Sequence, residues 1–442
     1  MGDFGWSNYL RSNPRPSLSL SKSQETWSPK ARVRYNTLTD ISWSATSFMA
    51  RPLSHHWRGT LQPLLAINPS RLVVAAGHTL HLYQFATFAT EGEASGVKFE
   101  GSCSLMNPRA ASSHISEIEF IPDGGLDQTL AVAFDDGVIE RVVLSHSPQP
   151  GTMIASHRDQ IFNYHEGGFT ESLTCDNDTL LSLASTGRVA LAPMLSSSPI
   201  TFSSESIDLK VRSWSARLSM KSSTPYAAFG TSSTTPLVAY PITNSELSPT
   251  ALAVLRAKSR GVFNSAVYGI SGVPPSSPLG SSPQLIVSGW YDGFVCVHDL
   301  RSSTRGYATN STAGPAPLLP VVEPLYDSWC PNPIYSVSCG GGSSAFVAAG
   351  SARHGVVSFW DVRTPKLGWS VHSPGNDWSP VYSLILESSR LFGATQSRPF
   401  VYDFGAGITS DTYPYVRGFI FNSNEGCYVT KYSHDNWDWD SE

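Results

Sequence analysis

This 442-residue chain lacks long apolar runs, paired cysteines and a strong net charge. No segment approaches the roughly 20 apolar residues that a helix needs to cross a membrane, and the N-terminus has no apolar run of signal-peptide length. The six cysteines are scattered, with no Cys-x-x-Cys spacing and no His/Cys cluster of zinc-binding spacing. We therefore expect a reduced intracellular protein, cytoplasmic or nuclear, with no membrane partner, no metal and no other cofactor.

Charge is sparse: charged residues make up 15% of the chain, and the formal net charge is −5. Such a surface has no general attraction for phosphate, so we expect no sequence-independent binding of nucleic acid. Catalytic signatures are missing too. The chain has no phosphate-binding glycine loop that opens a helix and no Gly-x-Ser-x-Gly elbow. The sequence gives no reason to expect an enzyme.

What the chain does contain is a repeated hairpin pattern, clearest at residues 285–301 and 346–363. In both copies an apolar segment ends in small residues, a tight turn follows at Gly293 or Gly355, and an alternating segment ends in Asp-x-Arg. An apolar strand, a turn with a glycine at positive φ and an alternating return strand together predict a β-hairpin.

Weaker copies of the pattern extend it over most of the chain. They occupy residues 72–85, 130–144, 180–191, 226–240 and 391–404. Glycines in or beside the expected turns include Gly77, Gly137 and Gly187. Seven hairpins at a spacing of about 45 to 60 residues predict a repeat architecture built from small antiparallel sheets.

The repeats resemble WD repeats, in which four strands form one blade of a propeller. Trp360-Asp361 is the signature dipeptide of that family, and His298-Asp299 is a degenerate copy. The resemblance implies an all-β fold, a seven-bladed WD-repeat-like β-propeller. We predict a flexible polar arm, a short helical segment, the propeller and an acidic tail, over residues 1–36, 37–60, 61–432 and 433–442 respectively.

A propeller must close, and strands from both ends of the chain usually complete one blade. We expect the closing strands at residues 64–67 from the N-terminal side, and at 415–421 and 427–432 from the C-terminal side. The helical segment should cover the seam, the place where the two ends of the chain meet in the ring. Trp43, Phe48 and Trp57 should then face the sheet.

Two stretches resemble parts of ubiquitin-ligase proteins. Residues 42–57 are similar to the region after the F-box in F-box/WD-repeat proteins, although residues 1–36 contain no Leu-Pro start and too little apolar sequence for the three F-box helices. Trp360-Asp-Val-Arg363 in full, and residues 298–301 in part, resemble the motif with which propeller receptors contact a cullin-ligase adaptor. That resemblance implies contact through Arg301 and Arg363; alternatively, both Asp-x-Arg motifs only stabilise their own turns.

The tail places Trp437 and Trp439 among acidic residues. Aromatic anchors flanked by carboxylates are typical of a short binding motif, but the tail could equally pack its indoles on the fold.

These patterns predict a non-catalytic scaffold for other proteins. Its expected role is a substrate-recognition or assembly subunit of a ubiquitin ligase, with a cullin-ligase adaptor and a substrate protein as partners. The alternative is a structural propeller subunit of a large assembly, such as a coat, a pore or a ribosome-biogenesis complex. The expected protein-binding residues are Arg301, Trp360, Asp361, Arg363, Trp437 and Trp439.

Overall fold

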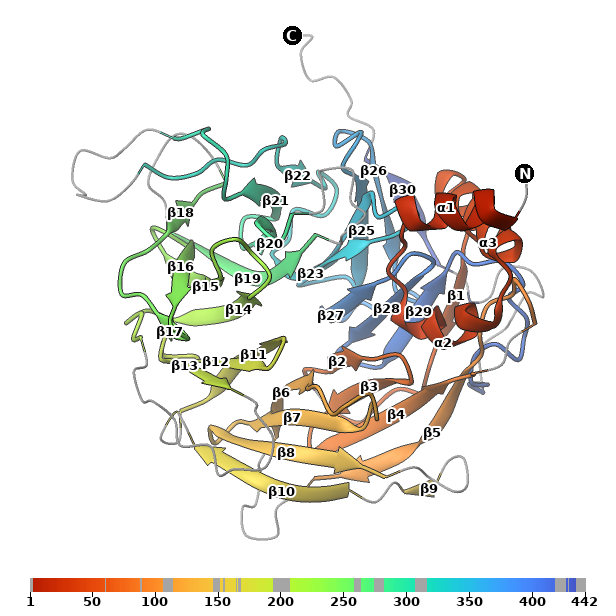
Figure 1. Ribbon diagram of the computed structural model, residues 1–442, viewed down its shortest axis with the longest axis horizontal. Helices are drawn as coiled ribbons and strands as arrows, with labels where there is room; N and C mark the ends of the chain where they lie inside the picture. The colour runs from red at the N-terminus through yellow and green to blue at the C-terminus, as the bar shows by residue number, and fades with distance from the viewer. Residues whose placement is uncertain are drawn as a thin grey trace.

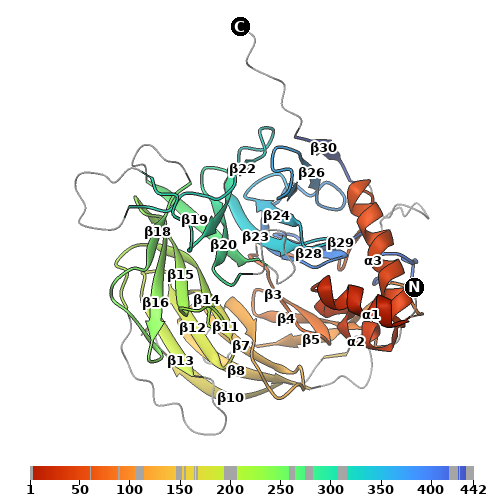
Figure 2. The same ribbon diagram turned by 45° about the horizontal axis from the view of Figure 1, so that its top comes forward.

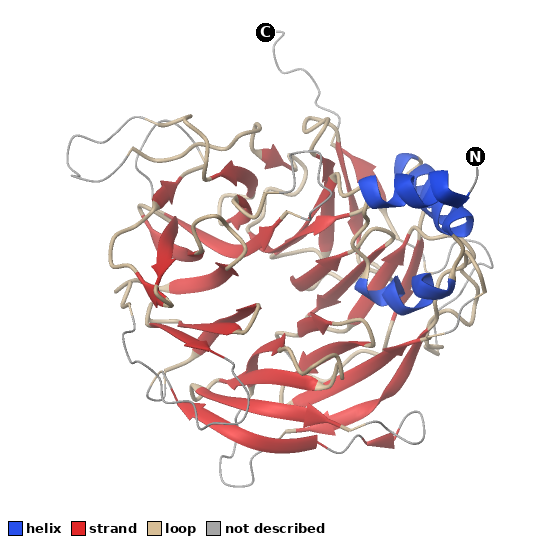
Figure 3. Cartoon of the chain, viewed as in Figure 1, coloured by secondary structure: helices blue, strands red, loops and turns tan. Residues whose placement is uncertain are grey.

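Antiparallel sheets stand around a common axis in the computed structural model, with three helices at one edge of the ring (Figures 1 and 3). The chain is a β-propeller. The structure describes residues 3–59, 61–87, 90–105, 114–145, 152–153, 156–163, 165, 168–193, 207–257, 264–273, 282–306, 316–417, 427 and 429–434.

In the six sheets the strands lie side by side from the axis outward, and the largest sheet joins two such groups of strands (Figure 1). The first contains β2 (Leu64–Ile67), β3 (Arg71–Ala76), β4 (Thr79–Phe85), β5 (Val97–Ser104) and β9 (Thr152–Met153). The second contains β6 (Ile115–Phe120), β7 (Thr129–Phe134), β8 (Val138–Leu144) and β10 (Ser156–Asn163). The third contains β11 (Thr170–Asp176), β12 (Thr179–Ala184) and β13 (Val189–Pro193).

A nine-stranded sheet follows. It contains β14 (Ser213–Ser219), β15 (Tyr226–Ser233), β16 (Leu237–Thr243), β17 (Glu246–Leu247), β18 (Ala253–Leu255), β19 (Ser265–Gly272), β20 (Leu285–Trp290), β21 (Phe294–Asp299) and β22 (Leu325–Tyr326). Only two residue pairs, Ser232 with Ala266 and Ser233 with Ser265, join its first five strands to its last four. Because the pairing merges two groups of strands in this way, the blade count of seven stays a prediction.

The last two sheets carry the ends of the chain. One contains β23 (Ile334–Gly340), β24 (Phe346–Ser351), β25 (Val356–Asp361), β26 (Gly368–His372) and β30 (Lys431–Ser433). The other contains β27 (Val381–Leu386), β28 (Arg390–Thr395), β29 (Pro399–Asp403) and β1 (Met49–Pro52).

All seven predicted hairpins are confirmed, because the expected strand pairs are antiparallel neighbours. The five glycines in or beside the turns have positive φ, from +57° at Gly355 to +99° at Gly187. The core lies between neighbouring sheets. Val73 and Leu82 of the first sheet, for example, pack in one cluster with Ile118 and Val132 of the second. This apolar contact between sheets stabilises the ring.

Closure differs from the prediction. The outer strand of the last sheet is β1, which pairs along its whole length with β29 (Pro52 opposite Phe400). Residues 64–67 form β2, the inner strand of the first sheet. Near the C-terminus, β30 adds to β26, and the backbone of Cys427 donates to Ala50 O at 2.9 Å. Of residues 415–421, only 415–417 lie in the described part of the chain, and they form no strand.

The N-terminal region also differs. Residues 1–36 were expected to form a flexible arm, but the structure has α1 (Asp3–Ser12), α2 (Leu18–Thr26) and α3 (Pro29–Ser44). The helical segment expected over 37–60 ends at Ser44 and is followed by β1. Figure 2 shows α2 and α3 beside the edges of the first and last sheets. Leu20, Trp27 and Tyr35 are at most 5% exposed and pack together.

Polar contacts explain why this polar sequence is ordered. Ser19 in α2 donates its backbone N–H to Glu387 at 3.0 Å, and its hydroxyl donates to the same carboxylate. Ser28 caps α3 by accepting from Ala31 N at 3.3 Å, with Pro29 in the first turn. Serines whose abundance predicted a flexible arm therefore form hydrogen bonds that order the helices, and Ser19 bonds directly to the propeller.

Trp43 confirms the prediction for the seam. Its side chain is 2% exposed, and its ring centre lies 3.6 Å from that of Phe404 and 4.4 Å from that of Phe346. Phe48 and Trp57 also pack against core clusters, each partly buried.

No helix within the described ranges is long and apolar enough to span a membrane. The six cysteines are free thiols.

The turn at Gly355 provides a test of the fold. A Cβ there would lie 1.8 Å from Asp377 O, and φ is +57°, whereas Gly124 has φ +74° with no atom within 4 Å. We expect Gly355→Ala to reduce the free energy of unfolding by more than about 2 kcal/mol and Gly124→Ala by about 1 kcal/mol, because only the first adds a clash to backbone strain. Denaturant titration measures both values, and equal losses would contradict the assigned turn.

Candidate functional site

The two Asp-x-Arg motifs adopt the same geometry. In each, the aspartate accepts the backbone N–H of the arginine and the guanidinium in a two-pronged ion pair. The shortest N···O distances are 2.7 Å for Arg301–Asp299 and 2.6 Å for Arg363–Asp361. The arginine side chains remain 53% and 55% exposed. The motif therefore stabilises its own turn and still leaves a guanidinium at the surface.

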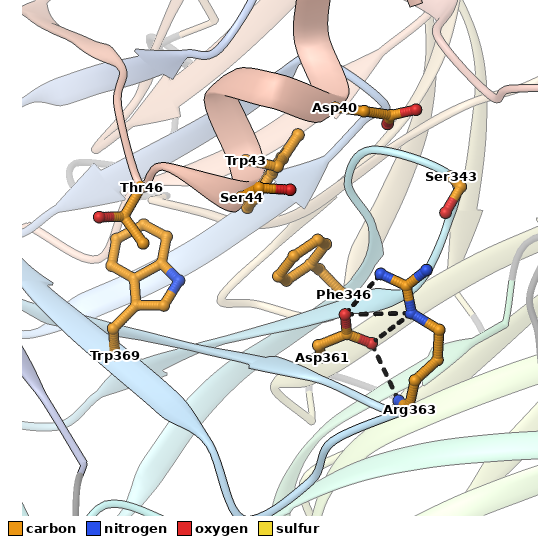
Figure 4. A pocket seen from close by; sticks show the side chains of 9 residues that line it. All are labelled: Asp40, Trp43, Ser44, Thr46, Ser343, Phe346, Asp361, Arg363 and Trp369. Carbon is orange, nitrogen blue, oxygen red and sulfur yellow. Dashed lines mark hydrogen bonds and ion pairs between the residues drawn. The ribbon is translucent and has the colours of Figure 1, made fainter. Parts of the chain in front are cut away.

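Only one of the two motifs lies beside a described pocket (Figure 4). This pocket of about 340 Å³ lies where the end of α3 meets the β23–β26 sheet. It is lined by Asp40, Trp43, Ser44, Thr46, Ser343, Phe346, Asp361, Arg363 and Trp369. Its charges are internally balanced, because Asp40 also forms an ion pair with Arg15 at 2.6 Å.

Trp360, predicted to be a protein-binding residue, lies in the interior instead. Its side chain is 1% exposed, and its ring centre lies 5.3 Å from that of His434. All residues of β25 before Asp361 are buried, so both faces of the strand are covered, and only Asp361 at its end is partly exposed. Trp437 and Trp439 lie outside the described residues.

A second site, which the sequence patterns did not reveal, surrounds the propeller axis. Six inner strands share a register shift near their first residues, where one residue is left out of the ladder. These bulge residues are Ser116, Glu171, Trp214, Tyr268, Tyr335 and Tyr382. A β-bulge re-aims the side chain of its extra residue, and all six side chains are partly exposed.

Four of the bulge residues form what we call the aromatic arc: Trp214, Tyr268, Tyr335 and Tyr382. Neighbouring ring centres lie 4.9, 5.4 and 5.6 Å apart in that order. The first two contacts are edge-to-face and the third is stacked, geometries that aromatic pairs favour. The indole N–H of Trp214 donates to Ser232 Oγ at 2.7 Å. The arc is thus a fixed, partly exposed aromatic surface.

The sequence does hold a signal for the arc. Each aromatic residue comes directly before a serine or glycine near the start of an inner strand, as in Trp214-Ser215 and Tyr335-Ser336. The small residue packs against the next inner strand: Ser215 Oγ donates to Val267 O, and Ser336 Oγ donates to Val381 O, both at 3.2 Å.

Charge borders the arc on one side. Arg212 places its guanidinium 3.9 Å from the ring centre of Trp214 and forms an ion pair with Glu171 at 2.9 Å. Burial raises the pKa of Glu171 to about 6, against the opposing effect of Arg212. One cation therefore already lies between a carboxylate and an aromatic face.

Two further glutamates of the neighbouring inner strand lie close by. Burial raises the pKa of Glu117 to about 8, and the charges of Glu119 and Glu171 add to the effect. Burial likewise raises the pKa of Glu119 to about 7, opposed by a backbone hydrogen bond from Cys175 and by Arg217. No ion pair to Glu117 or Glu119 is formed by any residue in the described ranges.

The arc and the Asp-x-Arg motifs lie at opposite ends of the sheets. Ile334, beside Tyr335, pairs with Ser351 at the end of β24, whereas Asp361 pairs with Phe346 at the start of β24. The two candidate surfaces can therefore be altered independently. Within the described residues, no group of three or more His, Cys, Asp or Glu side chains is placed to hold a metal ion.

Comparisons with known proteins identify the fold. No protein-family model matches the chain, and no curated protein matches its sequence. Among solved structures, it is similar to Sqt1 of Chaetomium thermophilum, which was determined bound to the N-terminus of the ribosomal protein L10. The TM-score is 0.50 at 15% sequence identity, over 77% of this chain and 83% of that one. The fold is a WD-repeat-like β-propeller.

The glutamate beside the arc gives a pH-dependent prediction. Because the pKa of Glu117 is raised to about 8 in the folded protein, its contribution to stability is full below about pH 4.5 and is lost as the pH rises through 8. We expect Glu117→Gln to unfold at the wild-type temperature at pH 5 and at least about 2 °C higher at pH 8.5. Calorimetry at both pH values, with the exposed Glu246→Gln as control, measures this; a constant difference would refute it.

Proposed function

We propose that this propeller is a non-catalytic protein-binding scaffold, and that the aromatic arc receives a segment of its partner. The arc carries the proposal, because four partly exposed rings on successive inner strands offer amphipathic contact area at little entropic cost. Exposed aromatic surface of this kind marks interaction sites more often than it serves folding.

Membership of a large assembly is the role that we favour. The solved structure to which the chain is similar holds the N-terminus of a ribosomal protein, which supports a function in assembling such complexes over substrate recognition in a ubiquitin ligase. Nothing in the comparisons supports an F-box or a cullin adaptor as partner. At this level of identity the argument is one of analogy between folds. We infer a cytoplasmic or nuclear location from that role.

The arc can be tested by removing two of its rings. We expect Trp214→Ala/Tyr335→Ala to lose specific partners from affinity purifications of the full chain, because both rings are surface contacts. Quantitative mass spectrometry measures the loss.

The control is Tyr9→Ala/Trp329→Ala, which removes the same two ring types from side chains that are 44% and 64% exposed elsewhere. It should keep all partners. Unchanged partners for the arc variant, at an unfolding temperature within about 2 °C of wild type, would refute the proposal.

A contact through Arg301 and Arg363 is a second proposal, supported by their half-exposed guanidinium groups. If a partner binds there, Arg301→Ala/Arg363→Ala should abolish its co-purification and leave the arc-dependent partners in place. Lys221→Ala/Lys366→Ala makes the same change of charge at exposed sites and should have no effect. Loss of cullin or adaptor peptides from the arginine variant would support the ligase hypothesis. An unchanged set of partners would refute both the arginine contact and the ligase hypothesis.

The tail can be tested from its last described residue. His434 is 3% exposed, and its Nε2 lies 2.7 Å from Ser370 Oγ and 3.3 Å from Asp327 Oδ2. Deletion of residues 435–442 leaves this anchor intact, so we expect an unchanged unfolding temperature and loss of any partner that binds Trp437 and Trp439. Trp437→Ala/Trp439→Ala should reproduce the loss. A lower unfolding temperature would instead show that the indoles pack on the fold.

A further inference from the structure

The arc lies next to uncompensated acidity. Glu171 stands at the bulge position directly before Trp214 around the ring, and Glu117 couples electrostatically to it. Among the described residues, the charged groups that act on them are Glu119 on the same strand, Arg212 and Arg217. On the other side of β6, residues 64–67 of β2 are all apolar. Within the part of the chain that the structure describes, three carboxylates thus share two cations.

Arg212 shows which ligand this surface favours. Its guanidinium lies over Trp214 and pairs with Glu171, and the side chain remains 40% exposed. A planar guanidinium stacks on an aromatic face and binds a carboxylate at its edge in the same pose. The contact is at the surface, so another guanidinium could replace it at little cost to the core.

The acidity is also unfavourable for the free protein. Burial raises the pKa of Glu117 to about 8 and that of Glu171 to about 6, because the surroundings compensate the charge of each ionised carboxylate only in part. Groups held in this state are frequent at functional sites. A cation that binds beside them recovers the missing electrostatic stabilisation.

We propose, building on the protein-binding function above, that the aromatic arc binds an arginine side chain of the partner, with its guanidinium between Glu171 and the rings of Trp214 and Tyr268. The partner is therefore a protein segment that is basic rather than acidic. Arg212 occupies part of this place in the free protein and moves aside, or stacks alongside, when the partner binds.

Fluorescence anisotropy tests the chemistry with defined probes. The probe is a fluorescein-labelled nonapeptide of glycine and serine that carries two arginines, and its counterpart carries citrulline at both positions. Citrulline keeps the shape of arginine and removes the charge. We expect saturable binding of the arginine peptide and at least about tenfold weaker binding of the citrulline peptide. Equal affinities, or no saturable binding below about 1 mM, would overturn the proposal.

Variants locate the binding. Glu117→Gln/Glu171→Gln should weaken the arginine peptide about tenfold, whereas Glu25→Gln/Glu246→Gln, the same change of charge at exposed positions, should leave its affinity unchanged. Arg212→Gln should strengthen binding of the arginine peptide, because it removes the cation that competes for the site between Glu171 and Trp214. Weaker binding by Arg212→Gln, or equal effects of the two glutamate pairs, would contradict the assigned pose.

The pH dependence provides a separate readout. Arginine stays charged, so affinity for its peptide should rise between pH 5.5 and 8.5 as the glutamates ionise, and this rise should shrink in the glutamate double variant. Failure here can be told apart from failure of the scaffold function. If partner capture needs Trp214 and Tyr335 but the peptides bind alike, the arc is a docking surface and only its ligand class is wrong.

Discussion

A fully buried ion pair between Arg390 and Asp403, on neighbouring strands of the last sheet, is the centre of the polar contacts that join this sheet to the first one. Both side chains are 0% exposed, and Arg390 Nε donates to Asp403 Oδ2 at 2.9 Å. Removal of either partner would leave a buried charge without compensation, at a cost of several kcal/mol. The pair persists because other segments complete it. Arg390 donates to Ser95 O at 2.6 Å, and the hydroxyl of Tyr413 donates to Asp403.

The partners of this pair come from distant parts of the chain. Ser95 precedes β5 of the first sheet, Tyr413 follows the last sheet, and Ser19 in α2 accepts at its backbone oxygen from Ser95. The seam is therefore held by polar contacts as well as by β1. It also fixes α3, since Trp43 donates its indole N–H to Ser388 O at 2.9 Å. Trp43 also stacks on Phe346 of the neighbouring sheet, and the end of α3 therefore lies beside Asp361 and Arg363 and lines the pocket in Figure 4.

The hairpins were predictable because their signals are local. A glycine that must adopt positive φ and an alternating strand on each side are visible in a dozen residues. The N-terminal helices were not predictable, because Ser19 forms its hydrogen bonds with Glu387, 368 positions away in the sequence. The closing strand was predicted wrongly for a related reason. Residues 64–67 were predicted to be the closing strand and 49–52 to belong to the helical segment, whereas pairing with β29 and the contact with Cys427 make 49–52 the closing strand.

The candidate sites divide in the same way. The Asp-x-Arg turns could be predicted from the sequence, since aspartate and arginine lie two residues apart and satisfy each other. The burial of Trp360 could not be predicted, because it depends on packing against β20 and β21 of the neighbouring sheet and on the contact with His434. The arc depends on a bulge in every contributing strand, and a bulge is a property of two paired strands rather than of one segment.

The bulges also explain how a repeated fold gains an individual site. Along the regular part of an inner strand, side chains must fit the neighbouring sheets, so small or apolar residues recur there: Ser172 and Ser215 are 7% exposed. At the bulge the ladder is interrupted and the side chain of the extra residue is re-aimed, and all six bulge residues are partly exposed. Replacement of a bulge residue therefore changes the surface more than the core. Glutamate can stand at one such position and tryptophan or tyrosine at the next four, on one unchanged framework.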